Sequence, residues 1–175
     1  MRLNLNLILL LTLALAGCAS YSGSSLKPGQ STQSDTRALM GEPAAVHAGP
    51  AGAAYAESWE YPRGPLGRHT FMARFDRQGR LLSIDQVLTE KTVAQLKMGE
   101  ATREDVRRTL GRPGNVISTR DGGEWWDYAA QDTRGHTRPI RIVVTFDARG
   151  IATAAGASYD PEEYSPNADG GSGQL

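Results

Sequence analysis

One sequence pattern occurs twice in this chain, and the duplication is the strongest constraint on its fold. Residues 26–43 align with residues 96–113 at a constant offset of 70, with eight identities in eighteen positions. Two shorter matches follow in the same order: WEY at 59–61 with WDY at 126–128, and FDRQG at 75–79 with FDARG at 146–150. Three ordered matches indicate a tandem duplication, so one unit of about 70 residues has to fold twice.

Each copy opens with the signals that begin and end a short helix. Thr32 and Thr102 can cap a helix N-terminus, and the aspartate three residues after each of them completes a capping box. Gly41 and Gly111 suit the left-handed position after the last helical residue, and a proline two residues further on stops the helix. A further turn of helix is expected around residues 92–97.

Strands with alternating side chains follow each helix. Period-two alternation places Trp59 with Tyr61, and Trp126 with Tyr128, on one face of a strand. A turn with glycine at positive φ joins the second strand of each copy to the third. The predicted strands are at 57–61, 71–75 and 81–88 in the first copy, and at 124–128, 140–146 and 151–158 in the second.

We therefore predict an α+β fold of two tandem units, each with short helices packed on a small antiparallel sheet of about three strands. The first unit is expected to span residues 26–89 and the second unit residues 90–164, joined near 90–95. Because a unit of about 70 residues buries only a limited core, the two units are expected to pack as one cooperative body.

The N-terminus predicts export and a lipid anchor. Residues 3–16 form a mostly apolar run of about 14 residues, which is too short for a transmembrane helix, and residues 1–17 are therefore predicted to be a signal peptide. The sequence LAGC that ends at Cys18 resembles the bacterial lipobox, in which the cysteine is acylated and becomes the mature N-terminus. Ala19, in place of the aspartate that favours inner-membrane retention, predicts a periplasm-facing protein of the outer membrane. Residues 18–25 are expected to be a flexible tether and residues 165–175 a disordered tail.

Charge and cysteine content exclude several classes of function. The chain has 19 Lys+Arg and 19 Asp+Glu, which argues against a nucleic-acid-binding surface, and its single cysteine excludes an internal disulfide and a multi-cysteine metal site. His47, His69 and His136 stand apart from other metal ligands, and no Gly-x-Ser-x-Gly nucleophile motif occurs. We therefore expect no enzyme activity, no metal and no cofactor.

The run LKMGEATREDVRRTLGRP at 96–113, followed by an aromatic strand and FDARG, resembles the SmpA/OmlA, or BamE-like, family of outer-membrane lipoproteins. The resemblance covers residues 96–158 well and residues 26–87 more loosely, since Thr36 and Met40 stand where the pattern has Val and Leu. It implies a two-layer α+β fold and a role in outer-membrane β-barrel assembly and envelope integrity. Two such units in one chain are also similar in architecture to the β-lactamase inhibitor protein, whose paired sheets form a concave protein-binding surface.

Two functions are compatible with these features. The first is a non-enzymatic binding or scaffold lipoprotein of the outer membrane, with an envelope protein as its partner, in outer-membrane protein assembly or envelope integrity. The second is a periplasmic protein inhibitor, or another protein–protein interaction module, that uses the tandem sheet surface.

Trp125 is the best candidate for contact with a partner. The repeat keeps Trp59 and Trp126, which are therefore expected in the core, whereas Trp125 has no counterpart and alternation turns it to the opposite face. Tryptophan is also one of the residues that most often dominates protein interfaces. A polar loop at 131–139 offers further binding residues. The predicted protein-binding residues are Trp125, Arg134, His136 and Arg138.

Overall fold

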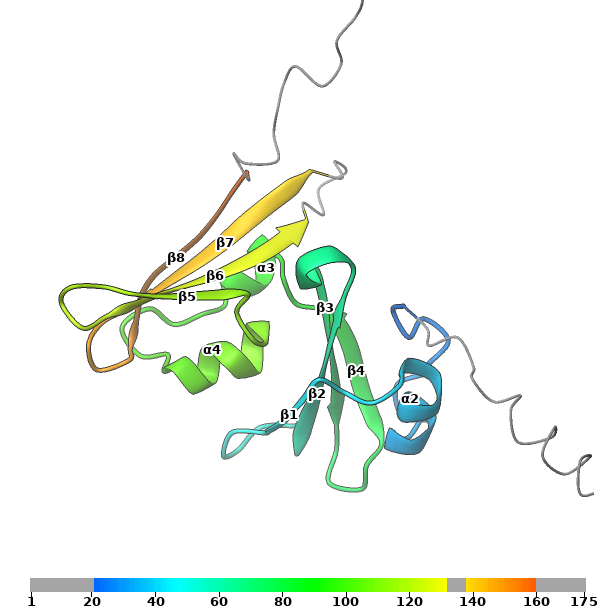
Figure 1. Cartoon of the computed structure of the whole chain (residues 1–175). Helices are drawn as coiled ribbons and strands as arrows, with labels where there is room; N and C mark the ends of the chain where they lie inside the picture. Colours follow the sequence, from blue (N-terminus) through cyan, green and yellow to red (C-terminus); the bar gives the residue numbers. More distant parts are fainter. Residues whose placement is uncertain (1–20, 132–137, 160–175) are drawn as a thin grey trace, which may run out of the picture.

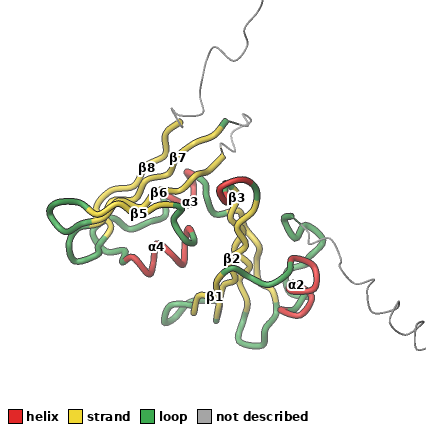
Figure 2. The backbone as a smooth tube through the Cα atoms, viewed as in Figure 1, coloured by secondary structure: helices red, strands yellow, loops and turns green. Residues whose placement is uncertain are grey.

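The computed structural model describes residues 21–131 and 138–159, and these contain two four-stranded antiparallel sheets. Sheet 1 has the order β1-β2-β3-β4 and sheet 2 the order β5-β6-β7-β8, so both are meanders (Figure 1, Figure 2). The strands are β1 (Ala45–Ala48), β2 (Glu57–Arg63), β3 (His69–Phe75), β4 (Leu81–Gln86), β5 (Asn115–Ser118), β6 (Glu124–Gln131), β7 (Pro139–Phe146) and β8 (Ala152–Tyr159). The helices among the described residues are α2 (Gln33–Met40), α3 (Glu90–Val93) and α4 (Arg103–Leu110), with the 3-10 turn η1 (Pro65–Gly67) between β2 and β3.

The α+β class is as predicted, but each sheet has four strands rather than three. The additional strands are β1, which pairs with β2, and β5, which pairs with β6. Each has four residues, too few for side-chain alternation to distinguish it from a loop. The helix predicted at 92–97 also lies earlier, at α3, because the Thr89 hydroxyl accepts the Thr92 N–H at 3.1 Å and so caps the helix.

Both α2 and α4 begin with the predicted capping box. The Asp35 N–H donates to Thr32 Oγ1 at 3.2 Å, and the Thr32 N–H donates to Asp35 Oδ2 at 2.8 Å. The same two bonds between Asp105 and Thr102 measure 3.2 and 2.9 Å. The backbone N–H of Thr32 lowers the pKa of Asp35, and the hydroxyl of Thr102 lowers the pKa of Asp105. Loss of an N-cap side chain typically costs about 1 kcal/mol.

Gly41 and Gly111 end these helices in a conformation that is essentially restricted to glycine. Their φ/ψ angles are 83°/−169° and 87°/−165°, so φ is positive as predicted but ψ is extended rather than helical. A Cβ at Gly41 would meet nothing within 4 Å, whereas a Cβ at Gly111 would lie 2.9 Å from Glu60 Oε1. Gly111 is therefore required both by the backbone and by the close approach of the first unit.

The same aromatic packing links helix and sheet in both units. Trp59 packs on Phe75, which ends β3, at a centroid distance of 4.8 Å, and Trp126 packs on the phenylalanine that ends β7 at 4.7 Å. An arginine of the helix lies over each indole: Arg37 of α2 at 4.6 Å and Arg107 of α4 at 4.9 Å. We call the tryptophan-bearing face of each sheet its inner face. In the second unit the buried cluster on this face includes Val106 and Leu110 of α4.

Two polar contacts complete this packing in each unit. Tyr61 and Tyr128 each donate a 3.3 Å hydrogen bond to the carbonyl of the glycine that ends the helix. Glu57 and Glu124 accept the N–H of the neighbouring indole at 3.1 and 2.7 Å. Glu124 also accepts a 2.9 Å bond from Arg103 of α4, and these bonds, the indole first, lower the pKa of Glu124. Gln33 of α2 likewise donates to Glu57. Helix and sheet are thus joined by matching contacts at both ends of the helix.

The outer face of sheet 1, opposite its tryptophan, meets the second unit. Ser58, Glu60 and Met72 on this face are buried, although they lie outside the core cluster of the first unit. The Glu60 carboxylate accepts the Arg112 backbone N–H at 3.0 Å, and His47 Nε2 lies 2.9 Å from its other oxygen. In Figure 1, α4 lies on the side of sheet 2 that faces sheet 1. A buried carboxylate left without a partner is costly, so this bond favours a fixed arrangement of the two units.

Residues 21–25, predicted as part of a flexible tether, lie against the first unit instead. The Tyr21 hydroxyl is 2.8 Å from His69 Nδ1, and the Tyr21 carbonyl accepts a 3.3 Å bond from Arg63 Nε. Leu26 follows in the buried cluster of the first unit. A single tyrosine in a run of serine and glycine gives no periodic signal, which is why this contact was not predicted. The predicted signal peptide, Cys18 and the predicted tail at 165–175 lie outside the described residues.

Gly111→Ala should destabilise the protein more than Gly41→Ala. Both variants place a side chain in the glycine-only conformation, at a cost of about 1–3 kcal/mol. Only Gly111→Ala pushes a Cβ into the Glu60 carboxylate and disturbs its bond to Arg112, which adds about 1–3 kcal/mol. Urea unfolding of the mature chain measures both losses. Equal losses would contradict the role of Gly111 at the junction of the units.

Candidate protein-binding surface

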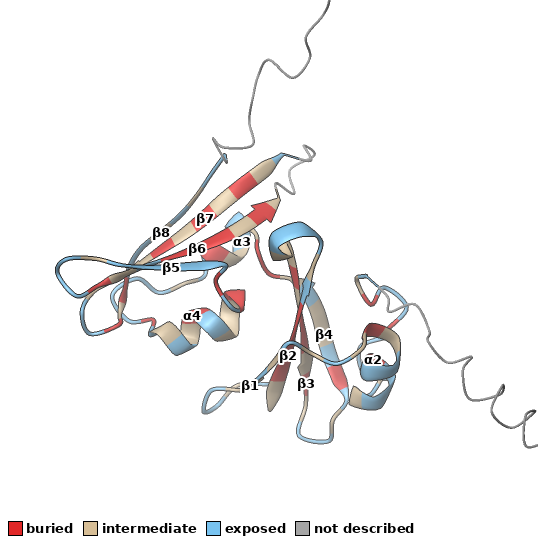
Figure 3. Cartoon of the chain, in the orientation of Figure 1, coloured by how far each residue is buried: buried red, intermediate tan, exposed pale blue. Residues whose placement is uncertain are grey.

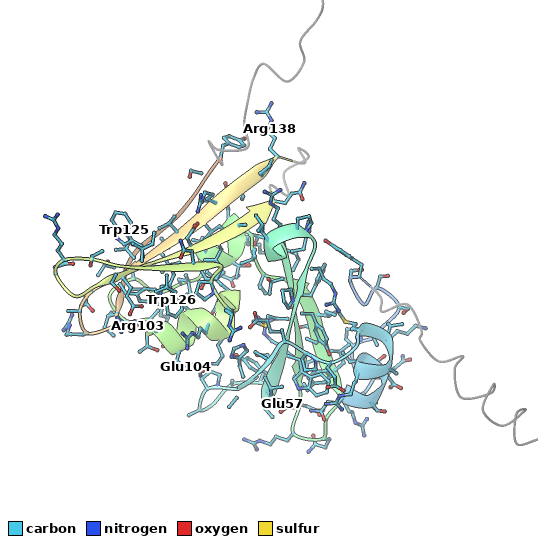
Figure 4. All side chains as sticks on the ribbon, in the orientation of Figure 1. Glu57, Arg103, Glu104, Trp125, Trp126 and Arg138 are labelled. Carbon is cyan, nitrogen blue, oxygen red and sulfur yellow. The ribbon has the colours of Figure 1, made fainter. Side chains whose placement is uncertain are left out.

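Strand β6 turns its two adjacent tryptophans to opposite faces of sheet 2. Trp126 is 1% exposed on the inner face, whereas Trp125 is 49% exposed on the outer face. Figure 4 shows the two side chains pointing apart, with Trp126 on the side of α4 and Arg103. The exposure predicted for Trp125 is therefore observed, and an exposed tryptophan on a strand is held more rigidly than one on a loop.

The strand register gives Trp125 its neighbours on the outer face. Ile117 of β5 and Thr145 of β7 pair with it on either side, and Ile117 is 46% exposed. Ile117 was not among the predicted site residues because β5 was not predicted. Its signal in the sequence is the pair of β-branched residues that follows Pro113, Gly114 and Asn115. We call the following set the open face: Ile117, Trp125, Asp127, Arg141, Val143 and Thr145.

An ion pair crosses the middle of the open face. Asp127 is 7% exposed, and its carboxylate accepts hydrogen bonds from two nitrogens of Arg141, the Nε bond measuring 3.1 Å. The pair joins β6 to β7 and cancels its own charge. The open face therefore presents an apolar contact, Trp125 with Ile117, beside a neutral polar patch. Aromatic residues and arginine are enriched at protein interfaces relative to the rest of the surface.

The repeat explains why this face is uncovered in sheet 2 alone. At the offset of 67 residues, Trp125 corresponds to Ser58 and Asp127 to Glu60. Ser58 and Glu60 are buried where the second unit meets sheet 1, and Glu60 bonds to Arg112. By contrast, no segment of the described chain covers the open face of sheet 2 (Figure 3). One duplicated surface thus forms the contact between the units, and its second copy is available to a partner.

Arg138 lies at the other end of β6 and β7 from Trp125 (Figure 4). Trp125 is near the start of β6, and Gln131 ends that strand beside the loop, about 20 Å away at the usual rise per residue. Arg138 Cζ is 5.7 Å from the centre of the Tyr159 ring. The structure therefore does not bring Arg138 and Trp125 into one site. The other predicted residues, Arg134, His136 and Cys18, lie outside the described residues.

The described histidines have partners within the fold. His47 bonds to Glu60, and His69 bonds to Tyr21. Within residues 21–131 and 138–159, no group of three His, Cys, Asp or Glu side chains is placed to hold a metal ion. No helix in this part of the chain has the length and apolar character needed to cross a membrane.

A cavity of about 240 Å³ lies between the units, lined by residues of both, among them Glu60, Leu66, Arg112 and Tyr128. Glu60 is already bonded to Arg112. Burial raises the pKa of Tyr128 above its usual value, so its hydroxyl stays protonated and donates to the end of α4. The polar groups named here are thus engaged in holding the units together.

Trp125→Ala and Trp126→Ala should separate a surface role from a core role. Truncating the buried Trp126 should cost about 3–5 kcal/mol of unfolding free energy, whereas truncating Trp125 should cost less than about 1 kcal/mol. Urea unfolding of the two variants measures the difference. Acrylamide quenching of the folded Trp125→Ala protein should also fall, because its remaining indoles are buried. A loss for Trp125→Ala as large as that for Trp126→Ala would show that Trp125 belongs to the core.

Comparison with known families finds a match for the second unit. Residues 86–156 match the family model described as the outer membrane protein assembly factor BamE domain. This segment contains α3, α4, β5, β6 and β7 and the first part of β8, and therefore carries the open face. No curated protein and no solved structure matches the chain. The matched segment begins at residue 86 and so leaves out most of the first unit. The likeness of the first unit to the second rests on the shared contacts described above. The resemblance to the SmpA/OmlA family is thereby confirmed, and residues 86–156 of this chain are a BamE-like domain.

Proposed function

We propose that this protein is a lipid-anchored, periplasm-facing lipoprotein of the outer membrane that takes part, without catalysis, in outer-membrane protein assembly or envelope integrity. The observation that carries the proposal is the position of a half-exposed tryptophan on the uncovered sheet face of a BamE-like domain. Its partner is an envelope protein that covers Trp125 and Ile117. The Asp127–Arg141 pair lies beside this contact and fixes β6 against β7 beneath the partner.

The position of Tyr21 supports an anchor that holds the first unit close to the membrane. Only residues 19 and 20 separate Cys18 from Tyr21, and Tyr21 is bonded to His69 and Arg63. Three residues of extended chain span at most about 10–11 Å. A diacylated Cys18 would therefore hold the start of β3 near the lipid headgroups. The open face, on the other unit, would remain accessible from the periplasm.

A deletion strain complemented with variants tests this function. Loss of the protein should sensitise cells to detergents and large antibiotics, and wild type and the control Leu82→Ala should restore resistance. Trp125→Ala should be present at normal levels yet fail to restore it, because truncating a central interface tryptophan costs about 2 kcal/mol or more of binding. Cys18→Ala should leave the membrane fraction while remaining folded.

Three results would contradict the proposal. Full complementation by Trp125→Ala would show that the function does not need the open face. Tight membrane association of Cys18→Ala would show that the protein is not held at the membrane by a lipid on Cys18. Unchanged barrier function in the deletion strain, together with capture of a soluble enzyme by the native protein, would favour an inhibitor instead.

A further inference from the structure

Strand β8 is an edge strand that lacks the usual protection against pairing. It is the last strand of sheet 2, and its eight residues, ATAAGASY, include no charge and no proline. Proteins commonly protect such edges with charged side chains or proline. The corresponding strand of the first unit, β4, carries Asp85, which forms a 2.8 Å ion pair with Arg74. The repeat therefore provides an internal comparison in which only β8 is left neutral.

The backbone of β8 is paired on its outer edge only at its start. The Gly99 N–H donates to the Ala152 carbonyl at 2.8 Å, and the Ala152 N–H donates to the Ala101 carbonyl at 2.8 Å. Beyond this point, no strand of residues 21–131 or 138–159 pairs with that edge. In an antiparallel strand every second residue directs its N–H and C=O away from the neighbour it pairs with. The stretch from Ala154 to Tyr159 thus offers backbone groups to an incoming strand.

An apolar groove runs beside this edge. It has a volume of about 330 Å³ and lies between β8 and the segment that contains α3. Ala155 and Ala157 on the β8 side belong to the inner face and pack, with Leu96, against the core cluster. Met98 on the other side is 39% exposed, and its flexible thioether can adapt to different side chains. The groove is lined by Glu90, Val93, Ala94, Leu96, Met98, Ala155, Gly156 and Ala157.

We propose that β8 binds an extended, uncharged polypeptide strand by β-augmentation, with apolar side chains at alternate positions of that strand entering the groove. Backbone hydrogen bonds to the Ala154–Tyr159 edge would supply affinity, and the groove would select for apolar residues at every second position. This alternation is the pattern of transmembrane β-barrel strands. The proposal rests on the proposed function and names its substrate: an outer-membrane protein strand before it has found its neighbours.

The chemistry of the groove disfavours the two occupants that this chain could itself provide. A second copy pairing through β8 would bring Ala155 and Ala157 to the groove, and these side chains are too small to fill it. Residues 160–175 carry Asp160, Glu162 and Glu163 directly after β8, and burying a carboxylate in an apolar groove is costly. A neutral strand matches the charge-free edge without either cost.

Peptide titration of the whole mature chain, carrying Cys18→Ser for solubility, tests the proposal. The probe is a capped peptide of the length of β8 that alternates leucine and threonine, and binding is followed by calorimetry and by NMR shifts of backbone amides. Gly156→Lys adds a charge at the edge where a Cβ meets nothing within 4 Å. It should weaken binding about tenfold or more, because the edge would then carry the kind of charge that natural edge strands use against pairing. The matched control Leu82→Lys, on β4, should bind as wild type does.

Two further peptides test the need for alternating side chains and for backbone hydrogen bonds, and a second variant tests the groove. A peptide with the same composition but leucines in one block, and a peptide N-methylated at alternate amides, should both bind at least about tenfold more weakly. Met98→Asp should weaken binding without touching β8. Equal binding by Gly156→Lys and wild type, equal binding of the N-methylated peptide, or self-association through β8 with no peptide binding would overturn the proposal. If the peptide results are as expected but the deletion strain remains resistant to detergents and large antibiotics, β8 binds a strand and the proposed assembly function is wrong.

Discussion

In each unit one tryptophan contacts a phenylalanine of its own sheet and an arginine of its own helix, so the helix cannot leave the sheet without breaking these contacts. An aromatic pair contributes about 0.5–1.5 kcal/mol beyond its buried area, and a cation–π contact about 0.5–2 kcal/mol. The tyrosine two residues later fixes the end of the same helix through its glycine carbonyl. The position of Gly111 follows from these contacts, and that position allows Glu60 to reach the Arg112 N–H.

Duplication gave the chain two equivalent sheet faces, and divergence gave them different neighbours. In sheet 1 the face has the small Ser58 and the long carboxylate of Glu60, which suit close contact with the second unit. In sheet 2 the same positions hold Trp125 and the shorter Asp127, which bonds to Arg141 of its own sheet. A terminal repeat normally turns a polar face to solvent. An exposed tryptophan beside an exposed isoleucine departs from that rule, and a partner that covers them accounts for the departure.

Local patterns allowed the sequence to predict the parts of the fold that depend on near neighbours. The capping boxes, the glycine ends and the burial of Trp59 and Trp126 follow from spacings of a few residues. Glu60 could not be predicted as a link between the units, because its partner Arg112 is 52 positions away and contributes only a backbone N–H. Trp125 was identified by alternation, but β6 continues to Gln131, beyond the strand predicted at 124–128, and this length separates Trp125 from Arg138.

In the native protein one copy of the duplicated face is covered by the other unit, and the second copy is open. Thiol labelling of two single-cysteine proteins, Ser58→Cys and Trp125→Cys in a Cys18→Ser background, tests this difference at equivalent positions of the two units. The thiol at position 125 should react at the rate of an exposed cysteine in the native protein, whereas the thiol at position 58 should react only on unfolding. Equal rates at the two positions under native conditions would contradict it.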